Sequence, residues 1–235
     1  MLPRAHPHPF PATRRLTLLV AALLALHVVL AWFALQAAFV FVELVWRIVA
    51  GRDELRALLA THLAQFRVLR LVQAGLWLVT AAAFVRWVGR AQGNLPALGA
   101  TGFRYAPRQA MAAFLVPGPN VVRPPAVLRE LWNASDPRYP AGTTWRAGRA
   151  PACVRWWWAL LLAAAAAEVA ARALALWSGD PLDLGPAMRV LVLGQLLAAA
   201  AAVLGITVVL GVDSRQEAAA WRRAGAPARS PDRRR

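Results

Sequence analysis

The sequence contains no lysine and only one cysteine, so all 27 of its basic residues are arginines. The single cysteine, Cys153, excludes an intramolecular disulfide and any CxxC pair for metal binding or redox chemistry. HExxH, GxSxG, Walker and Rossmann motifs and a Ser/Lys pair are missing in any suitable context. We therefore expect no catalytic residue, no cofactor and no metal, and we favour a protein that is not an enzyme.

Acidic residues are scarce, with 11 against 27 arginines, which leaves a formal net charge of +16. In a soluble protein this charge would favour nucleic acid as the partner. The chain is 59% hydrophobic, however, and in membrane proteins arginines gather in cytoplasmic loops next to anionic lipid headgroups. We therefore expect the lipid bilayer, and not nucleic acid, as the anionic partner. Arginine without lysine, together with abundant Ala, Pro and Gly, is typical of a GC-rich bacterial genome.

Two long runs carry no Asp, Glu or Arg: residues 16–42, a run of 27, and residues 190–212, a run of 23. As helices they reach roughly 40 Å and 35 Å, against about 30 Å for the hydrocarbon core of a bilayer. A soluble domain of this size has no need of such helices. The chain is therefore predicted to be an integral membrane protein.

Hydropathy predicts four spans, at about residues 16–46, 69–88, 154–177 and 190–212. They lie in a membrane domain of residues 16–213. Residues 1–15 are Pro-rich and predicted to be disordered, and residues 214–235 form an arginine-rich cytoplasmic tail. Residues 52–67 are amphipathic and too short and charged to span, so they either lie on the membrane surface or extend the second span.

The loop of residues 90–152 holds most of the prolines, which argues against long regular elements. Within it, residues 109–122 form an uncharged stretch of 14 with two prolines, a length that fits a re-entrant or interfacial segment better than a span. Pro124 and Pro125 suit the first turn of a short helix over residues 126–132.

Arginine counts predict the orientation. With four spans, the N-terminal segment, the central loop and the tail share one side of the membrane, and they hold 20 of the 27 arginines. That side is expected to be the cytoplasm of a bacterial cell, with both termini cytoplasmic and the chain in the inner membrane. The expected fold class is all-α: a four-helix transmembrane bundle with a Pro-rich cytoplasmic loop that contains the re-entrant or interfacial segment.

Residues 103–137, FRYAPRQAMAAFLVPGPNVVRPPAVLRELWNASDP, resemble the hallmark of an uncharacterised bacterial integral-membrane family, the domain of unknown function 4328. The specific part is the run RELWNASDP, and a Phe–x–Val–Pro–x–x–Asn core begins at Phe114. The Gly118–Pro119 pair and the loose match around residues 103–107 depart from the family pattern. The resemblance covers roughly residues 69–212. It implies a four-helix membrane domain and no activity.

The main candidate site is a polar cluster in this loop, made of Asn120, Arg123, Arg129, Glu130, Trp132 and Asp136. Two acids and two arginines near a membrane surface fit phosphate-headgroup binding or an acid/base pair. Alternatively, Arg129 and Glu130 pair with loop groups, and Asp136 caps a turn before Pro137. The structural alternative is favoured.

A second candidate is the pair Glu168 and Arg172, which lie four residues apart inside the third predicted span. An unpaired charge at the bilayer centre costs at least about 3 kcal/mol, so these two are expected to pair and to face the bundle. They form either a substrate or proton site, with His27 as an additional candidate, or a contact that holds helices together. Small residues at four-residue spacing, including Ala167 and Gly194, predict close packing of the third and fourth spans.

Three functions are compatible with these features. We favour a multi-pass membrane protein that acts as a non-enzymatic scaffold, partner-binding or regulatory component, with a membrane-protein partner or a second copy of the chain. The alternative is a small transporter or channel subunit that uses Glu168 and Arg172. The third is an intramembrane enzyme that acts on lipid through Glu130 and Asp136.

Overall fold

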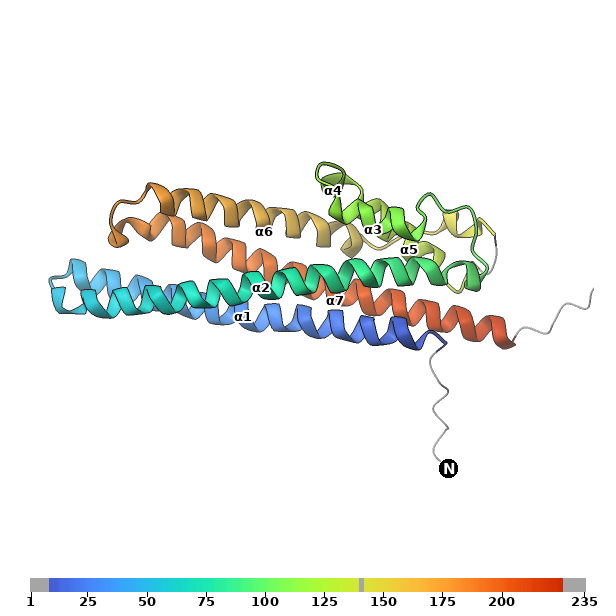
Figure 1. Ribbon diagram of the computed structural model, residues 1–235, viewed down its shortest axis with the longest axis horizontal. Helices are drawn as coiled ribbons and strands as arrows, with labels where there is room; N and C mark the ends of the chain where they lie inside the picture. Colours follow the sequence, from blue (N-terminus) through green and yellow to red (C-terminus); the bar gives the residue numbers. More distant parts are fainter. Residues whose placement is uncertain (1–8, 140–141, 226–235) are drawn as a thin grey trace, which may run out of the picture. The chain divides into compact units, whose positions relative to one another are not determined.

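The computed structural model describes residues 9–139 and 142–225, and every regular element in that part is a helix (Figure 1). The four long helices are α1 (Pro11–Val49), α2 (Arg56–Asn94), α6 (Ala152–Trp177) and α7 (Gly185–Gly225). Three shorter helices, α3 (Pro107–Leu115), α4 (Pro119–Val122) and α5 (Pro124–Ala134), occupy the central loop. Short 3₁₀ helices are η1 (Asp53–Leu55), η2 (Pro96–Leu98), η3 (Thr144–Ala147) and η4 (Pro181–Leu184). The predicted all-α class is confirmed.

Each of the four long helices is long and apolar enough to cross a membrane. Large apolar side chains are exposed along them, such as Trp32 (60%), Leu78 (74%) and Leu176 (85%). Such surfaces are unfavourable in water and normal against lipid tails. The protein is therefore an all-α, four-helix membrane bundle, as predicted.

Two segment boundaries differ from those expected. Residues 11–15 were assigned to a disordered segment and residues 214–225 to a tail, but they form the first turn of α1 and the last turns of α7. The rest of those segments, residues 1–8 and 226–235, lies outside the described part. Of the two alternatives for residues 52–67, the structure has the second: from Arg56 onward they are continuous with the second span in α2.

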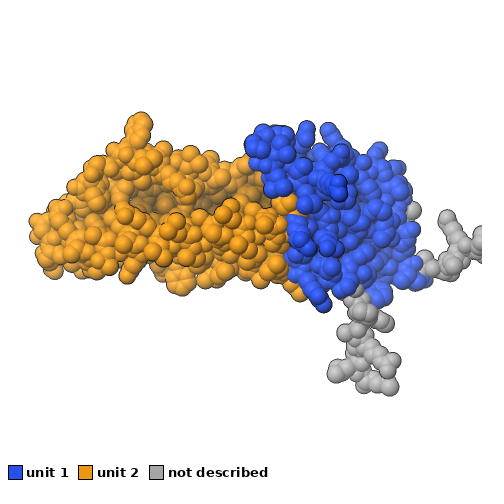
Figure 2. All heavy atoms as spheres, in the orientation of Figure 1, with its two compact units in different colours: residues 1–17, 86–150, 210–235 blue, residues 18–85, 151–209 orange. Residues whose placement is uncertain are grey.

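Residues 18–85 and 151–209 form one compact unit, which we call unit 2 (Figure 2). Its helices approach closely where the side chains are small. A Cβ on Gly194 of α7 would lie 3.2 Å from the Ala167 Cβ of α6, which is the close packing that the small residues predicted. A Cβ on Gly205 of α7 would lie 2.8 Å from the Trp157 indole nitrogen and 3.1 Å from Leu24. The same unit contains an apolar core around Phe41, made of residues of α1, α2 and α7.

The other compact unit, unit 1, is assigned residues 1–17, 86–150 and 210–235, and its described part is residues 9–17, 86–139, 142–150 and 210–225 (Figure 2). It contains α3, α4 and α5 together with the ends of α1, α2 and α7. Thr17 of α1 donates a hydrogen bond to Asp213 of α7 (3.1 Å) and accepts one from the Trp87 indole of α2 (3.0 Å), and Arg14 pairs with the same aspartate. These buried bonds explain why the helices continue into segments that looked unstructured.

The uncharged stretch 109–122 is not a single element. It is divided between α3 and α4 by Val116, Pro117 and Gly118, and Gly118 has a φ of +85°, which favours glycine. Leu115, Val116, Val121 and Val122 are all exposed. Two helices of 9 and 4 residues with exposed apolar side chains favour the interfacial alternative over the re-entrant one.

Candidate functional site

Helix α5 organises the candidate site. Pro124 and Pro125 lie in its first turn, where a missing backbone N–H costs nothing, and Pro137 follows shortly after its end. Val127, Leu128 and Leu131 are completely buried, whereas Arg129 is exposed on the opposite side. The amphipathic pattern therefore anchors the helix and leaves one face of it open.

Glu130 is buried and attaches a neighbouring loop to α5. Its carboxylate accepts hydrogen bonds from the backbone N–H groups of Arg104 (2.9 Å) and Tyr105 (3.2 Å) and from the Gln92 side chain (3.0 Å). The Gln92 amide also donates to the Tyr105 carbonyl at 2.9 Å. This is the structural alternative, in which Glu130 pairs with loop groups.

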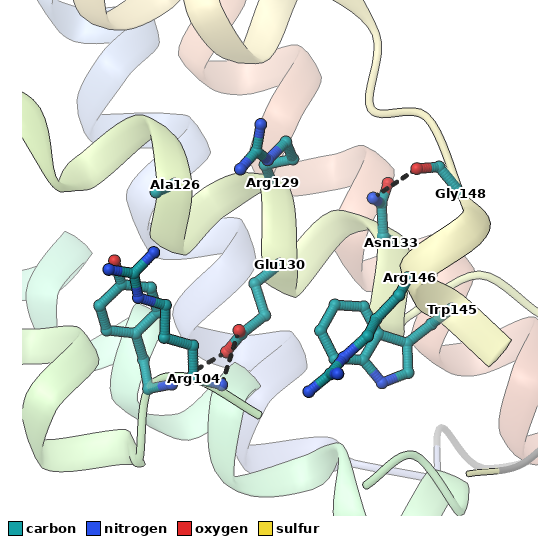
Figure 3. A pocket seen from close by; sticks show the side chains of 9 residues that line it. Arg104, Ala126, Arg129, Glu130, Asn133, Trp145, Arg146 and Gly148 are labelled. Atoms are coloured by element: carbon teal, nitrogen blue, oxygen red, sulfur yellow. Dashed lines mark hydrogen bonds between the residues drawn. The ribbon is translucent and has the colours of Figure 1, made fainter. Parts of the chain in front are cut away.

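A pocket of about 300 Å³ opens beside Glu130 (Figure 3). Its lining residues are Arg104, Tyr105, Ala126, Arg129, Glu130, Asn133, Trp145, Arg146 and Gly148. Three arginines and a single carboxylate thus line the pocket. The pocket is net positive and suits an anionic ligand.

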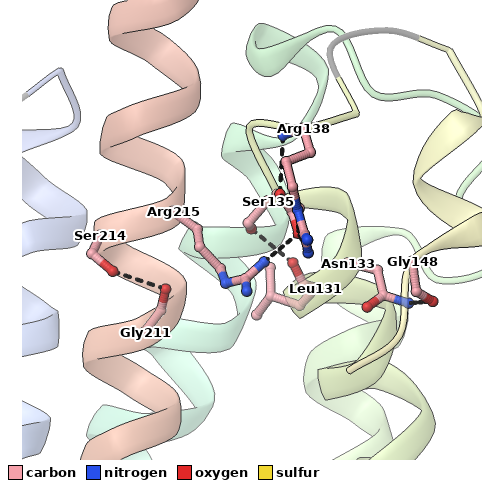
Figure 4. Close-up of polar contacts among 9 residues, drawn as sticks. Leu131, Asn133, Ser135, Arg138, Gly148, Gly211, Ser214 and Arg215 are labelled. Atoms are coloured by element: carbon pink, nitrogen blue, oxygen red, sulfur yellow. Dashed lines mark hydrogen bonds and ion pairs between the residues drawn. The ribbon is translucent and has the colours of Figure 1, made fainter. Parts of the chain in front are cut away.

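The rim of this pocket is built from two segments that are far apart in the sequence. The Trp145 indole donates to the Thr101 carbonyl at 2.9 Å, and Arg146 donates to the Gly102 carbonyl. On the other side, the Asn133 amide donates to the Gly148 carbonyl at 2.8 Å (Figures 3 and 4). These bonds hold the aromatic and arginine side chains of the rim in place.

Asp136 follows α5 and binds two arginines, Arg138 and Arg215. Figure 4 shows the side chains of these two arginines converging from the loop after α5 and from α7. It accepts the backbone N–H of Arg138 at 3.0 Å, the Arg138 guanidinium at 2.7 Å and the Arg215 guanidinium of α7 at 2.7 Å. Burial alone would raise the pKa of Asp136, but the hydrogen bonds from Arg138 and Arg215 outweigh it and hold that pKa well below its ordinary value. Asp136 therefore caps the turn around Pro137 and connects it to α7.

Trp132 packs against α7 in the same region. The Arg215 guanidinium lies over its ring, 4.4 Å from the centroid, and a Cβ on Gly211 would lie only 2.6 Å from ring atoms. The absence of a side chain at Gly211 is thus what admits the indole. Within the described residues, the buried indole nitrogen of Trp132 has no hydrogen-bond partner.

The six residues of the predicted cluster do not form one site. Arg129 and Glu130 line the pocket, whereas Trp132 and Asp136 meet Arg215 of α7. Arg123 and Asn120 line neither place: Arg123 is exposed at the start of α5, and Asn120 lies in α4. Glu130 thus binds Gln92 and the loop at Arg104 and Tyr105. Asp136 binds Arg138 and Arg215.

Sequence reasoning missed two of the pocket arginines and one buried glutamine. The pocket arginine Arg104 comes from a loop and Arg146 from η3, and each lies over the ring of its aromatic neighbour, Tyr105 or Trp145, at 5.6 Å. The dipeptides Arg104–Tyr105 and Trp145–Arg146 were the available signal. Gln216 was missed as well: it is buried and donates to the Ala91 carbonyl (2.9 Å) and the Ser135 hydroxyl (3.2 Å).

In unit 2, Glu168 pairs with Arg172 at 3.0 Å and also with Arg70 of α2. Next to Arg70, the Gln73 amide donates to the Gln195 side chain at 3.1 Å. These five side chains form a polar chain within the membrane-spanning helices. The third intramembrane candidate, His27, is hydrogen-bonded to Thr80 at 3.1 Å instead.

No group of three or more His, Cys, Asp and Glu side chains is placed to hold a metal ion in the described ranges 9–139 and 142–225.

Four apolar membrane helices and a folded, arginine-rich loop define the class: a multi-pass α-helical membrane protein. Residues 50–214 match the domain of unknown function (DUF4328), and the chain belongs to that family. The match covers most of the chain, including α5 and the pocket. Neither a curated protein nor a solved structure matches the chain.

Proposed function

We propose that this protein is a non-enzymatic component of the bacterial inner membrane, with both termini in the cytoplasm and unit 1 as its binding part. In this role it recruits or regulates a partner through positive charge at the inner membrane surface. The anionic headgroups of the bilayer are the first partner that this charge would meet.

The observation that carries the proposal is the uneven distribution of charge. Unit 1 contains 19 of the 27 arginines and five of the 11 acids, whereas unit 2 contains eight arginines and six acids. A segment with so large an excess of arginine is retained on the cytoplasmic side during insertion. The same excess attracts anionic surfaces.

The acids of unit 1 support a binding role over catalysis. Glu130 is occupied by backbone N–H groups and Gln92, Asp136 by two arginines, and Asp213 by Arg14 and Thr17. A general acid or base needs access to a substrate, and these carboxylates are committed to holding the fold. The lipid-acting enzyme that uses Glu130 and Asp136 is therefore no longer supported by a specific geometry.

The proposal is tested by the topology of the chain in bacterial cells. A fluorescent protein fused after residue 235 is expected to fluoresce, and alkaline phosphatase at the same position is expected to be inactive. Phosphatase inserted in the turn at Gly179 is expected to be active. The reverse pattern would place the arginine-rich unit outside the cytoplasm and refute the proposal.

The binding role is tested separately by limited trypsin digestion of the protein in nanodiscs. Cleavage at the exposed arginines Arg149 and Arg222 of unit 1 is expected to slow when phosphatidylglycerol replaces phosphatidylcholine and to recover at high salt. Arg56, which pairs with Asp53 in unit 2, serves as the internal control. Equal effects at all three sites would contradict a role specific to unit 1.

A second candidate, a small transporter or channel subunit, is favoured by the polar chain of Arg70, Glu168 and Arg172 with Gln73 and Gln195. Charged side chains inside membrane helices often mark ion pathways. Proteoliposomes would then show an ion or proton flux that Glu168→Gln abolishes. Glu43→Gln, which alters an exposed Glu–Arg pair of the same spacing, is the matched control. Absence of flux in the unaltered protein would exclude this candidate.

A further inference from the structure

The pocket beside Glu130 has the composition of an anion site. Three arginines, Arg104, Arg129 and Arg146, and one carboxylate, that of Glu130, line it. Both oxygens of that carboxylate already accept hydrogen bonds: one from Gln92 and the Tyr105 N–H, the other from the Arg104 N–H. A ligand in the pocket therefore meets an excess of positive charge and of unused N–H donors.

Two of the arginines are held in defined positions. The guanidinium groups of Arg104 and Arg146 lie over the rings of Tyr105 and Trp145, each 5.6 Å from the centroid. Stacking on an aromatic face orients a guanidinium but uses few of its five N–H donors. Arg129 is exposed on α5, and Figure 3 shows its side chain on another side of the pocket.

The geometry points to a binding site for a phosphate group, held by Arg104, Arg129 and Arg146. The planar fork of arginine matches two oxygens of a phosphate, and such charge-assisted pairs are about twice as strong as neutral hydrogen bonds. The volume of about 300 Å³ accommodates a phosphate together with a small group attached to it. Asn133 and the Trp145 ring line the part of the pocket that such a group would contact.

Two sources can supply this phosphate: a lipid headgroup and a soluble phosphate ester. The exposed apolar residues Leu115, Val116 and Val122 belong to the same unit as the pocket. Such residues favour a position at the headgroup level of the bilayer. The chemistry of recognition is the same for both sources. The inference rests on the proposed function only in taking unit 1 as the binding part of the protein.

The first experiment uses the full-length protein in dodecyl maltoside, a detergent without phosphate, titrated calorimetrically with inorganic phosphate and glycerol 3-phosphate. Saturable binding is expected. Arg129→Gln and Arg104→Gln are each expected to weaken it about tenfold, because each removes one charge-assisted contact. The second substitution leaves intact the Arg104 N–H that binds Glu130.

Arg108→Gln and Arg123→Gln are the matched controls, since both arginines are exposed in unit 1 but do not line the pocket. Binding in these variants is expected to equal that of the unaltered protein. Thermal unfolding of each variant separates loss of binding from loss of fold. An equal loss in pocket and control variants would overturn the inference, because it would reveal a diffuse basic surface.

The second experiment distinguishes the sources by native mass spectrometry of the protein from mixed lipids. Retention of phosphatidic acid or phosphatidylglycerol that Arg129→Gln reduces and Arg123→Gln does not identifies a lipid source. Phosphate binding in the calorimeter without such retention identifies a soluble source. Absence of both effects overturns the inference.

Failure of the proposed function gives a different result. If fusions locate unit 1 outside the cell while phosphate binding still depends on Arg129, the phosphate site is supported and the proposed cytoplasmic role is refuted. If the topology is as proposed and no phosphate binds, the inference alone is refuted.

Discussion

Glu130 and Asp136 are close in sequence and similar in chemistry, yet they have different structural roles because their surroundings differ. Glu130 accepts two backbone N–H groups and one amide, so it holds a loop. Asp136 accepts from two guanidinium groups, so it connects the end of α5 to α7. The difference follows from position: Glu130 lies on the helix, and Asp136 lies just after its end.

Replacing Glu130 with alanine is expected to destabilise the protein by about 3 kcal/mol, because three donors lose their acceptor in a buried place. Arg129→Ala, one residue away and exposed, is expected to change stability by less than about 0.5 kcal/mol. Thermal unfolding in detergent measures both. Similar unfolding temperatures for the two variants would contradict the role given to Glu130.

Asp136 makes stability depend on pH. Its pKa is lower in the folded protein than the ordinary value of 3.8, so the charged form stabilises the fold above that value. This contribution is lost as the pH falls below about 4 towards the folded-state pKa. Asp136→Asn is therefore expected to lower the unfolding temperature at pH 7, and the difference from the unaltered protein is expected to shrink in acid. A difference that stays constant between pH 7 and pH 3 would argue against this role; Asp53→Asn, in an exposed pair, is the control.

At the scale of elements, α5 and α7 approach each other closely at Trp132 and Gly211. The ring of Trp132 occupies the space that a side chain at Gly211 would need, and Arg215, one turn further along α7, covers the ring. A glycine inside a long helix lowers the stability of that helix, because glycine has a low helix propensity. Here it allows a large aromatic residue to approach the helix backbone.

Gly211→Ala is accordingly expected to destabilise the protein by about 1–3 kcal/mol, because a Cβ 2.6 Å from a rigid ring forces the ring to move. Gly93→Ala in α2 is the matched control. No atom lies within 4 Å of a Cβ at that position, so improved helix propensity is expected to leave stability unchanged or slightly higher. Unfolding temperatures of the two variants decide the matter, and equal values would mean that Trp132 adjusts without cost.

At the scale of the whole molecule, charge and apolar surface are separated along the chain. Unit 1 has 19 arginines against five acids, and unit 2 has eight against six. The long helices expose large apolar side chains, including Trp32, Leu78 and Leu176. Lipid tails are the solvent that such a surface requires.

The protein is therefore expected to remain in the membrane pellet after extraction with carbonate at pH 11, which removes proteins held by charge alone. It is expected to enter solution only with detergent. Release by carbonate would mean that the arginines, and not the apolar helices, hold it at the membrane. A peripheral membrane protein in the same sample provides the control for complete extraction.

The ends of the spans could not be predicted from the sequence, because they depend on hydrogen bonds and ion pairs between residues that are far apart in the chain. Hydropathy located the four apolar helices, because a run of apolar residues is a local property of the chain. It could not extend α1 back to Pro11 or α7 on to Gly225, because those turns depend on the bonds of Arg14 and Thr17 to Asp213, about 200 residues away. Polar residues at the end of a span look the same in sequence whether they are paired or solvated.

The candidate region likewise contains features that local sequence predicts and features that depend on distant residues. The short helix after Pro124 and Pro125, the turn at Asp136 and the Glu168–Arg172 pair all depend on neighbours within a few residues, and local pattern was enough to anticipate them. The pocket of Arg104, Arg129 and Arg146 was not foreseen, because it combines α5 with a loop and with η3, which are distant in the sequence. In the folded protein, Glu130 and Asp136 are buried next to different hydrogen-bond partners, which the sequence does not indicate. Apolar periodicity and arginine counts are readable along a chain, whereas the meeting of distant polar groups depends on how the helices and loops pack.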